Sequence, residues 1–163
     1  TEESVKGYDP AFKMNPPLRT KADAEALVAG LKDGTIDAIA SDHAPHPAEA
    51  KERPFSEAPF GIIGLEATLG LCTTFLVHAG LLTWPEIIAL LSANPARILG
   101  IPNGTLAEGA DADVTLIDPD RAWTLDVDAF ASKSRNSPYH GWRLKGKAVR
   151  VFVLGEEKWR EEE

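Results

Sequence analysis

Cysteine is almost absent from the sequence, and this absence limits both the fold and its compartment. Cys72 is the only cysteine among 163 residues, so no disulfide can form within the chain. Proteins without disulfides are typical of reducing compartments, and we therefore expect a cytoplasmic location. Cys72 follows Leu65 and Leu69 at helical spacing, which favours a place in the core over a reactive thiol.

Positive charge and long apolar runs are also lacking. The 17 Lys and Arg residues are outnumbered by 25 Asp and Glu residues, which gives a formal net charge of -8. Because nucleic-acid binding depends on a basic surface, no nucleic-acid partner is expected. No apolar run reaches the roughly 18 residues that a membrane-spanning helix needs. Residues 1–10 lack the layout of a signal peptide, so no membrane association is expected.

Histidine is scarce, and this limits the metal chemistry of the chain. The four histidines form neither an H-x-H nor an H-x-x-x-H pair. His78 falls late in a predicted buried helix, where a core histidine is expected, and His140 precedes Gly141 in a predicted turn. A catalytic zinc site needs about three protein ligands, so it cannot be completed from this chain. The sequence therefore predicts that further chain takes part in any metal site.

The patterns that are present divide the chain near residue 100. Hydrophobic residues make up 44% of the sequence and charged residues 26%, as in ordinary globular proteins. Before residue 100, helical periodicity predicts helices that start at Lys21, near Ile62 and at Trp84. Two capping boxes open the first and third of these helices, Thr20 with Asp23 and Thr83 with Glu86. Gly34 is expected to end the first helix, and NPARILG, residues 94–100, predicts a brief helical turn with an Asn cap.

After residue 100 the periodicity of helices disappears. Three strand-like runs follow, at 112–118, 122–126 and 148–155. Turn signals occur at 103–104, 108–109 and 118–119. Residues 1–100 are therefore predicted to form an α/β region and residues 101–163 a small β-rich unit.

The stretch IASDHAPH, residues 39–46, places an acid and two histidines after a short apolar run. TIDAIA, residues 35–40, is typical of a strand buried on both faces, and in α/β folds the chemistry lies beyond the carboxyl ends of the strands. A carboxylate at Asp42 can ligate a metal or shuttle a proton, and the prolines beside His46 stiffen its loop. Two interpretations stay open: an acid/base or metal site, or a polar loop in which His43 and His46 are merely solvated.

Two further stretches add candidate ligand contacts. In KMNPPLR, residues 13–19, Asn15 precedes two prolines, which hold it extended with its amide in a fixed direction. Arg19 adds a positive charge, although most lone arginines are only solvated. In PFG, residues 59–61, Gly61 lets backbone amides approach a flat ligand closely, and a plain turn explains it equally well.

Taken together, these stretches closely resemble the dihydroorotase family of the amidohydrolase superfamily. The resemblance is carried by KMNPPLR, SDHAPH and PFGIIGLEATLGL, and later by NPARILG, GADADVTLIDPD and SRNSPYHGWRLKGKAVRVFVLG. Hydantoinases and allantoinases share individual pieces. The combination of Asn15 before PPLR with His46 at the end of DHAPH points to the dihydroorotases among these relatives.

The resemblance implies a fold and a truncation. The family fold is an α/β (β/α)8 barrel of the TIM type with a small β-sandwich. Residues 1–100 would be the C-terminal part of that barrel, with about its last two strands, and residues 101–163 the C-terminal part of the sandwich. The family's H-x-H, its carboxylated lysine and two further histidine ligands have no counterpart here. A barrel that lacks most of its strands exposes two edges, so we expect the isolated chain to be unstable and inactive.

The resemblance also implies a reaction, the zinc-dependent interconversion of N-carbamoyl-L-aspartate and L-dihydroorotate in pyrimidine synthesis. Asp42 would ligate zinc and handle the proton. The substrate would be bound by Asp42 and by four further residues, Asn15, His46, Phe60 and Gly61. The resemblance gives His43 no role.

The resemblance also suggests partners. It implies a small-molecule substrate, one or two zinc ions, a missing N-terminal part and a homo-oligomer. A rival interpretation is a catalytically inactive partner of aspartate carbamoyltransferase, and a hydantoinase or allantoinase is the other alternative.

Overall fold

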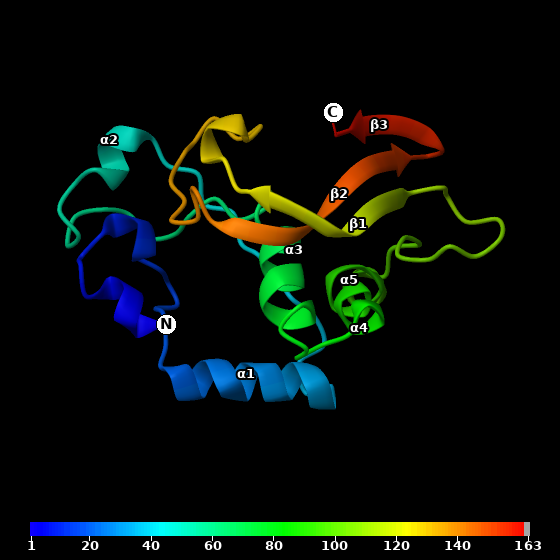
Figure 1. Ribbon diagram of the computed structural model, residues 1–163, viewed down its shortest axis with the longest axis horizontal. Coiled ribbons are helices and arrows are strands. Elements are labelled where there is room, and N and C mark those ends of the chain that lie inside the picture. The colour runs from blue at the N-terminus through cyan, green and yellow to red at the C-terminus, as the bar shows by residue number, and fades with distance from the viewer. Residues whose placement is uncertain (162–163) are drawn as a thin grey trace. The chain divides into compact units, whose positions relative to one another are not determined.

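The computed structural model describes residues 1–161, and its regular elements are mostly short. The α-helices are α1 (Lys21–Asp33), α2 (Ala48–Lys51), α3 (Thr68–Cys72), α4 (Trp84–Ile88) and α5 (Asn94–Leu99) (Figure 1). π-Helical turns, Thr73–Val77 and Ala89–Ala93, continue α3 and join α4 to α5. Short 3-10 helices are Glu2–Val5, Pro10–Phe12 and Val127–Ala129. The strands are β1 (Val114–Thr124), β2 (Arg143–Val153) and β3 (Glu156–Arg160).

The chain forms two compact units, each built from separate stretches of sequence. The first contains residues 1–33, 41–68 and 124–142, and the second contains residues 34–40, 69–123 and those from 143 on. These two units do not coincide with the two regions that the sequence predicts on either side of residue 100. The predicted division at residue 100 concerns the barrel and sandwich of a longer protein, and it stays a prediction.

The second unit is organised around a three-stranded sheet in the order β1-β2-β3 (Figure 1). Its buried apolar side chains are Leu82, Ile87, Leu90, Ala96 and Leu144. The fully buried Thr73 donates its hydroxyl to the carbonyl of Lys145 at 2.6 Å, which ties the π-helical turn to β2. Gly70 is required in α3, because a Cβ there would lie 2.6 Å from the ring of Trp123.

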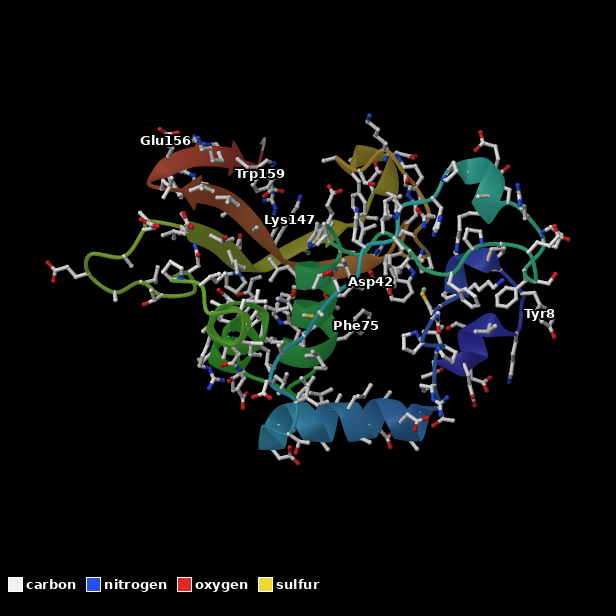
Figure 2. All side chains as sticks on the ribbon, turned by 180° about the vertical axis from the view of Figure 1, so that it is seen from behind. Tyr8, Asp42, Phe75, Lys147, Glu156 and Trp159 are labelled. Carbon is white, nitrogen blue, oxygen red and sulfur yellow. The ribbon has the colours of Figure 1, made fainter. Side chains whose placement is uncertain are left out.

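Strand β3 is a charged edge strand that the sequence patterns do not predict. It pairs antiparallel with β2, with Trp159 opposite Val151, and a tight turn joins the two strands. Leu154 (φ 51°) and Gly155 (φ 79°) both adopt positive φ in this turn, as a two-residue hairpin of type I′ requires. All five β3 residues are exposed, and Figure 2 shows Glu156 and Trp159 on this strand.

Two of the predicted helix starts, at Lys21 and Trp84, are confirmed, because they depend on local hydrogen bonds. Thr20 and Asp23 close the first capping box, with the hydroxyl of Thr20 2.8 Å from the Asp23 carboxylate. Thr83 and Glu86 close the second at 2.7 Å. The prediction for Asn94 is wrong, because its side chain donates to the carbonyl of Asp37 instead of capping α5.

The predicted helix from residue 62 starts six residues later, at Thr68, because residues 62–67 contact the loops of the first unit instead. The predicted turn at 118–119 lies inside β1, where the Asp118 carboxylate accepts from the amides of Asp120 and Arg121.

The predicted strand over residues 35–40 does not form within the described residues. Ile39 donates its amide to the carbonyl of Leu90, and no ladder runs beside it. A strand of a parallel sheet exists only through its neighbours, and the described residues offer it none. The two barrel strands expected from the resemblance are therefore absent as strands, and the observed sheet lies entirely within residues 114–160.

Helix α1 has the amphipathic pattern expected of it but buries none of its residues. Leu27, on the predicted apolar face, is 56% exposed. A 13-residue helix is only marginally stable in water without tertiary packing.

Candidate functional site

The loop that carries Asp42 is pinned to the segment that follows Gly61. Asp42, labelled in Figure 2, is exposed, and its backbone adopts a positive φ of 52°. Aspartate tolerates this region better than most residues, because its short side chain bonds locally. Its Oδ1 accepts from the amide of His43 at 2.6 Å. Gly64 approaches the same loop so closely that a Cβ would lie 2.4 Å from the carbonyl oxygen of Asp42.

His43 and His46 both make specific contacts, so neither is merely solvated. The Nδ1 of His43 accepts from the amide of Gly64 at 3.3 Å. The Nε2 of His46 lies 3.0 Å from the carbonyl oxygen of Phe60. Because a carbonyl only accepts, Nε2 carries the proton in this contact, and Nδ1 of the neutral ring is left as an acceptor. The structure thus brings together two of the predicted substrate-binding residues, His46 and Phe60.

Both the backbone amide and the backbone carbonyl of Gly61 form hydrogen bonds. It adopts a φ of +96°, and a Cβ would lie 2.6 Å from the Cβ of Ala44. Its amide donates to the carbonyl of Lys13 at 2.8 Å. Its carbonyl accepts from Lys51 at 3.0 Å and from Asn136 at 3.3 Å. Gly61 therefore permits a close approach of two loops, and its own amide points into the protein.

Two buried lysines stabilise this loop, and sequence reasoning missed both. The Nζ of Lys13 donates to the carbonyls of Ser56 and Ala58 and lies 4.7 Å from the ring centre of Phe60. Lys51, only 8% exposed, donates to Pro10 at 2.7 Å and to Pro59 at 3.1 Å, besides Gly61. Burial is the main cause that lowers the pKa of Lys51. The positive charge of Lys13 acts in the same direction, while Asp9 opposes it.

Asn136 is a further residue of this site that sequence reasoning missed. Its side chain is buried, and it bonds to the backbone of His46, Ala44 and Gly61. These contacts span up to 92 positions of sequence, so no local pattern could have indicated them.

Asn15, by contrast, is exposed and lies where the chain bends, joined to Pro16 by a cis peptide bond. The bend replaces the extended conformation expected from the prolines. Lys13, two residues earlier, is the link between this segment and the loop of Gly61.

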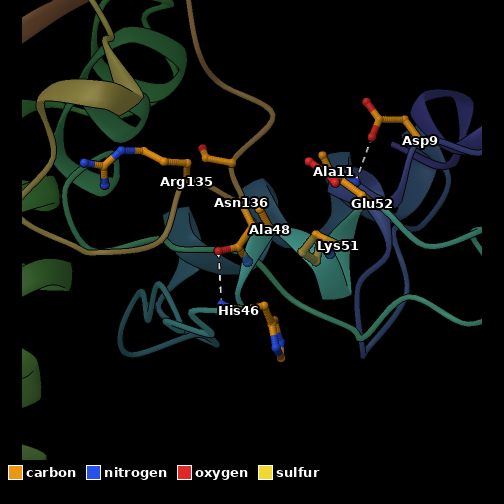
Figure 3. A pocket seen from close by; sticks show the side chains of 9 residues that line it. Asp9, Ala11, His46, Ala48, Lys51, Glu52, Arg135 and Asn136 are labelled. Carbon is orange, nitrogen blue, oxygen red and sulfur yellow. Dashed lines mark hydrogen bonds between the residues drawn. The ribbon is translucent and has the colours of Figure 1, made fainter.

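A shallow hollow of about 270 Å³ lies on one side of this unit. Figure 3 shows that His46, Lys51 and Asn136 contribute to its wall, and that the Arg135 side chain points away from them. The other lining residues are Asp9, Ala11, Ala48, Glu52 and Ser137. Asp42, Asn15, Phe60 and Gly61 are not among them, so we do not assign this hollow to the predicted substrate.

The residues around Asp42 fit one corner of a zinc site. Its carboxylate is exposed and has the donor chemistry that zinc accepts. The nearest histidines are engaged elsewhere, His43 with Gly64 and His46 with Phe60. The role of Asp42 as a zinc ligand stays a prediction.

A second group of possible metal ligands lies in the described residues, namely Asp126, Asp128 and His140. All three are exposed and have other partners. Asp126 accepts from the amide of Asp128 and lies 3.6 Å from Nδ1 of His140, while Asp128 pairs with Arg135 at 3.6 Å. These contacts explain the cluster as caps and ion pairs of the loop around Val127–Ala129.

Comparison with known proteins identifies the class. Residues 14–158 match the Amidohydrolase family. The chain belongs to this family.

Particular relatives narrow the comparison. The chain is 53% identical over 155 residues to dihydroorotase of Geobacter metallireducens and 54% identical over 155 residues to dihydroorotase of Pelotomaculum thermopropionicum. Each match covers 95% of this chain and 36% of the relative, so the chain spans about a third of the length of these relatives.

A solved structure gives the fold independently. The L-hydantoinase (dihydropyrimidinase) of Arthrobacter aurescens superposes with a TM-score of 0.93 at 31% identity, over 100% of this chain and 37% of that protein. The fold of the chain is therefore similar to that of the matching part of this L-hydantoinase. No helix among the described residues has the length and apolar character to span a membrane.

Proposed function

We propose that this chain contributes the Asp42 side of a dihydroorotase active site within a longer zinc-dependent enzyme. The observation that supports the proposal is that two loops of the first unit contact each other. His46 contacts Phe60, and Gly61 lies against Ala44, so residues of two separate motifs meet in one place. The identity of about half with named dihydroorotases supports the same reaction.

The rest of the enzyme is proposed to come from the portion of the relatives that this chain does not span. Asp42 supplies one ligand where about three are needed. The exposed apolar side of α1 supports the same conclusion, because Leu27 in a larger barrel would face neighbouring elements. We extend the proposal to the (β/α)8 barrel and to the division near residue 100, with residues 101–163 in a β-sandwich. A cytoplasmic homo-oligomer, with aspartate carbamoyltransferase as a possible partner, completes this proposal.

The chemistry asked of this chain is proton transfer and substrate contact. Bound zinc would supply a water acidified to a pKa of about 7, close to the working pH. In the hydrolytic direction, the Asp42 carboxylate takes the proton from the attacking water as the new C–O bond forms. It then delivers that proton to the ring nitrogen as the C–N bond breaks. The exposed position of Asp42 at a fixed backbone turn suits a group that must meet both atoms.

The remaining predicted contacts are proposed to orient the substrate. His46 has Nδ1 as a free acceptor in the neutral ring, because Nε2 is committed to Phe60. Asn15 offers both donor and acceptor groups from an exposed position. The exposed ring of Phe60 offers a flat apolar surface beside that of the substrate. Gly61 keeps the loop close enough for these contacts.

The test is steady-state hydrolysis of dihydroorotate by the full-length enzyme that contains this chain. Asp42→Ala should remove nearly all turnover, since general acid–base transfer alone is worth about 10²–10⁴-fold. His46→Ala and Asn15→Ala should retain zinc and lose kcat/KM, with a raised KM. His43→Ala is the control in the same loop, with a milder effect expected. Near-normal rates for Asp42→Ala, or an equal loss for His43→Ala, would refute the assignment.

A hydantoinase is the second candidate, favoured by the structural match to the L-hydantoinase. The two functions differ in substrate, so both are measured on the same enzyme preparation. Dihydroorotate turnover without hydantoin turnover supports the dihydroorotase. Turnover of hydantoins alone supports the second candidate, and a zinc-free enzyme without either activity supports the inactive partner of aspartate carbamoyltransferase.

A further inference from the structure

We propose that Asn136 is a positioning residue that sets the geometry of His46 and of the Phe60–Gly61 loop for the reaction. The inference rests on the proposed function and adds a residue to it. Asn136 lies in the sequence stretch 124–142, far from both loops along the chain, and joins them within the first unit.

The Asn136 side chain uses all of its hydrogen-bonding groups on the two loops. Its Oδ1 accepts from the amide of His46 at 3.3 Å, the contact drawn in Figure 3. Its Nδ2 donates to the carbonyl of Ala44 at 2.9 Å and to that of Gly61 at 3.3 Å. Its own backbone carbonyl accepts from the amide of Ile63 at 3.1 Å. One residue thus connects both sides of the contact between His46 and Phe60.

Only an amide side chain can satisfy this set of partners. The amide of His46 requires an acceptor, whereas the carbonyls of Ala44 and Gly61 require donors. Aspartate has almost the same shape but no donor when ionised, so it would place a carboxylate against two carbonyl oxygens. Alanine would leave all three backbone groups without this partner. Asn136 is 9% exposed, and water therefore replaces these bonds poorly.

The residues around Asn136 hold it from the opposite side. Arg135 donates from its guanidinium to the carbonyls of Ser132, Ser134 and Asp128, and its Nε lies 3.6 Å from the Asp128 carboxylate. The amide of Ser137 donates to the carbonyl of Arg135 at 2.8 Å. Asn136 therefore extends from an anchored loop, which a positioning role requires.

A displacement of these loops should affect the reaction without removing any reacting group. The imidazole of His46 is held by its Nε2 contact to Phe60 and by the backbone on which it stands. When Asn136 is lost, the His46 amide and the Ala44 carbonyl lose this partner and their loop can shift, whereas Gly61 stays bonded to Lys51 and Lys13. A misplacement of about 1 Å can reduce a rate about 100-fold, even when it originates away from the reacting atoms.

The experiment compares Asn136→Ala and Asn136→Asp with wild type in the full-length enzyme, using dihydroorotate hydrolysis, zinc analysis and thermal melting. We expect both variants to keep wild-type zinc content and to lose kcat/KM by about 10–100-fold, with a raised KM. Thr73→Val is the matched control. It removes a fully buried side-chain hydrogen bond in the other unit, so it should lower Tm while kcat/KM stays within about twofold of wild type.

A double-mutant cycle separates positioning from a general loss of structure. If Asn136 acts through His46, Asn136→Ala should lower kcat/KM by less than about threefold in a His46→Ala background. Equal losses in both backgrounds would overturn the inference, and so would variants that lower Tm like Thr73→Val but leave KM at the wild-type value. If Asn136→Ala does not fold, the isosteric Asn136→Asp decides by the same criteria. An inactive wild-type enzyme would overturn the proposed function and this inference with it, whereas the other two results overturn the inference alone.

Discussion

Replacing Lys51 by methionine should loosen the loop that carries Phe60 and Gly61. The Lys51 ammonium is nearly buried and donates to three carbonyls, those of Pro10, Pro59 and Gly61. Methionine has a similar length and no donor, so the substitution removes these hydrogen bonds with little change in shape.

The size of the effect follows from the carbonyls that lose their partner. Gly61 keeps the hydrogen bond from Asn136 and Pro10 keeps the one from the amide of Lys13, while the Pro59 carbonyl loses the hydrogen bond that Lys51 provides. One acceptor left unsatisfied costs about 1–3 kcal/mol. Removing the buried charge, which burial disfavours, offsets part of this cost. We expect the loop to lose about 1–2 kcal/mol of local stability, which increases its opening about 5- to 30-fold.

Hydrogen exchange of the backbone amides in residues 52–64 of the full-length enzyme measures this opening directly. Lys21→Met is the matched control, because it removes the same charge from the same unit. The Lys21 side chain is 87% exposed and contacts only Glu25 at 3.7 Å among the ion pairs of the described residues. Hydrogen exchange of residues 52–64 in Lys21→Met should match that of wild type. Unchanged exchange in Lys51→Met, or equal changes in both variants, would refute the reasoning that the buried ammonium holds the loop.

Two further predictions concern the same unit. Gly61→Ala should destabilise the enzyme by about 1–3 kcal/mol, because the new Cβ would lie 2.6 Å from that of Ala44 at a φ of +96°; denaturant titration checks this, and an unchanged midpoint contradicts it. The pKa of Asp23 lies below its usual value because the side chain and backbone of Thr20 donate to it. This stabilisation is present above the unfolded pKa of about 3.9 and is lost as the pH falls through the lower folded value. Asp23→Asn should therefore lower Tm near neutral pH and match wild type once the pH lies well below the folded pKa, and a constant difference across this range would contradict the capping role.

The sequence predicts those parts of the fold that depend on neighbours a few residues apart. The two capping boxes and the helix end at Gly34 belong to this group, because each partner lies within one or two helical turns. Strand β3 escaped prediction because its charged residues lack alternation, and it exists through pairing with β2. The expected strand at 35–40 does not form for the complementary reason, since its pattern is that of a strand but the described residues offer it no neighbouring strand.

In the candidate site, too, the residues that lie in local motifs were predicted and the residues that hold them from a distance were not. Asp42, His46 and Phe60 were indicated by motifs, and the structure places His46 against Phe60. The groups that hold them, Lys51 and Asn136, carry no motif. A buried lysine is rare enough that no pattern favours it, and the role of an asparagine depends on carbonyls up to 92 positions away.

The distance along the chain between His46 and Asn136 also has a consequence for how the protein is made. The two residues are 90 positions apart, and ribosomes add about 5–20 residues per second. His46 is therefore synthesised about 5–18 s before the residue whose side chain binds its backbone. Contacts of such high sequence separation form late in folding, because a long loop must first close. During synthesis the SDHAPH loop thus lacks its contacts to Asn136, and it reaches its final geometry only after residue 136 has been added.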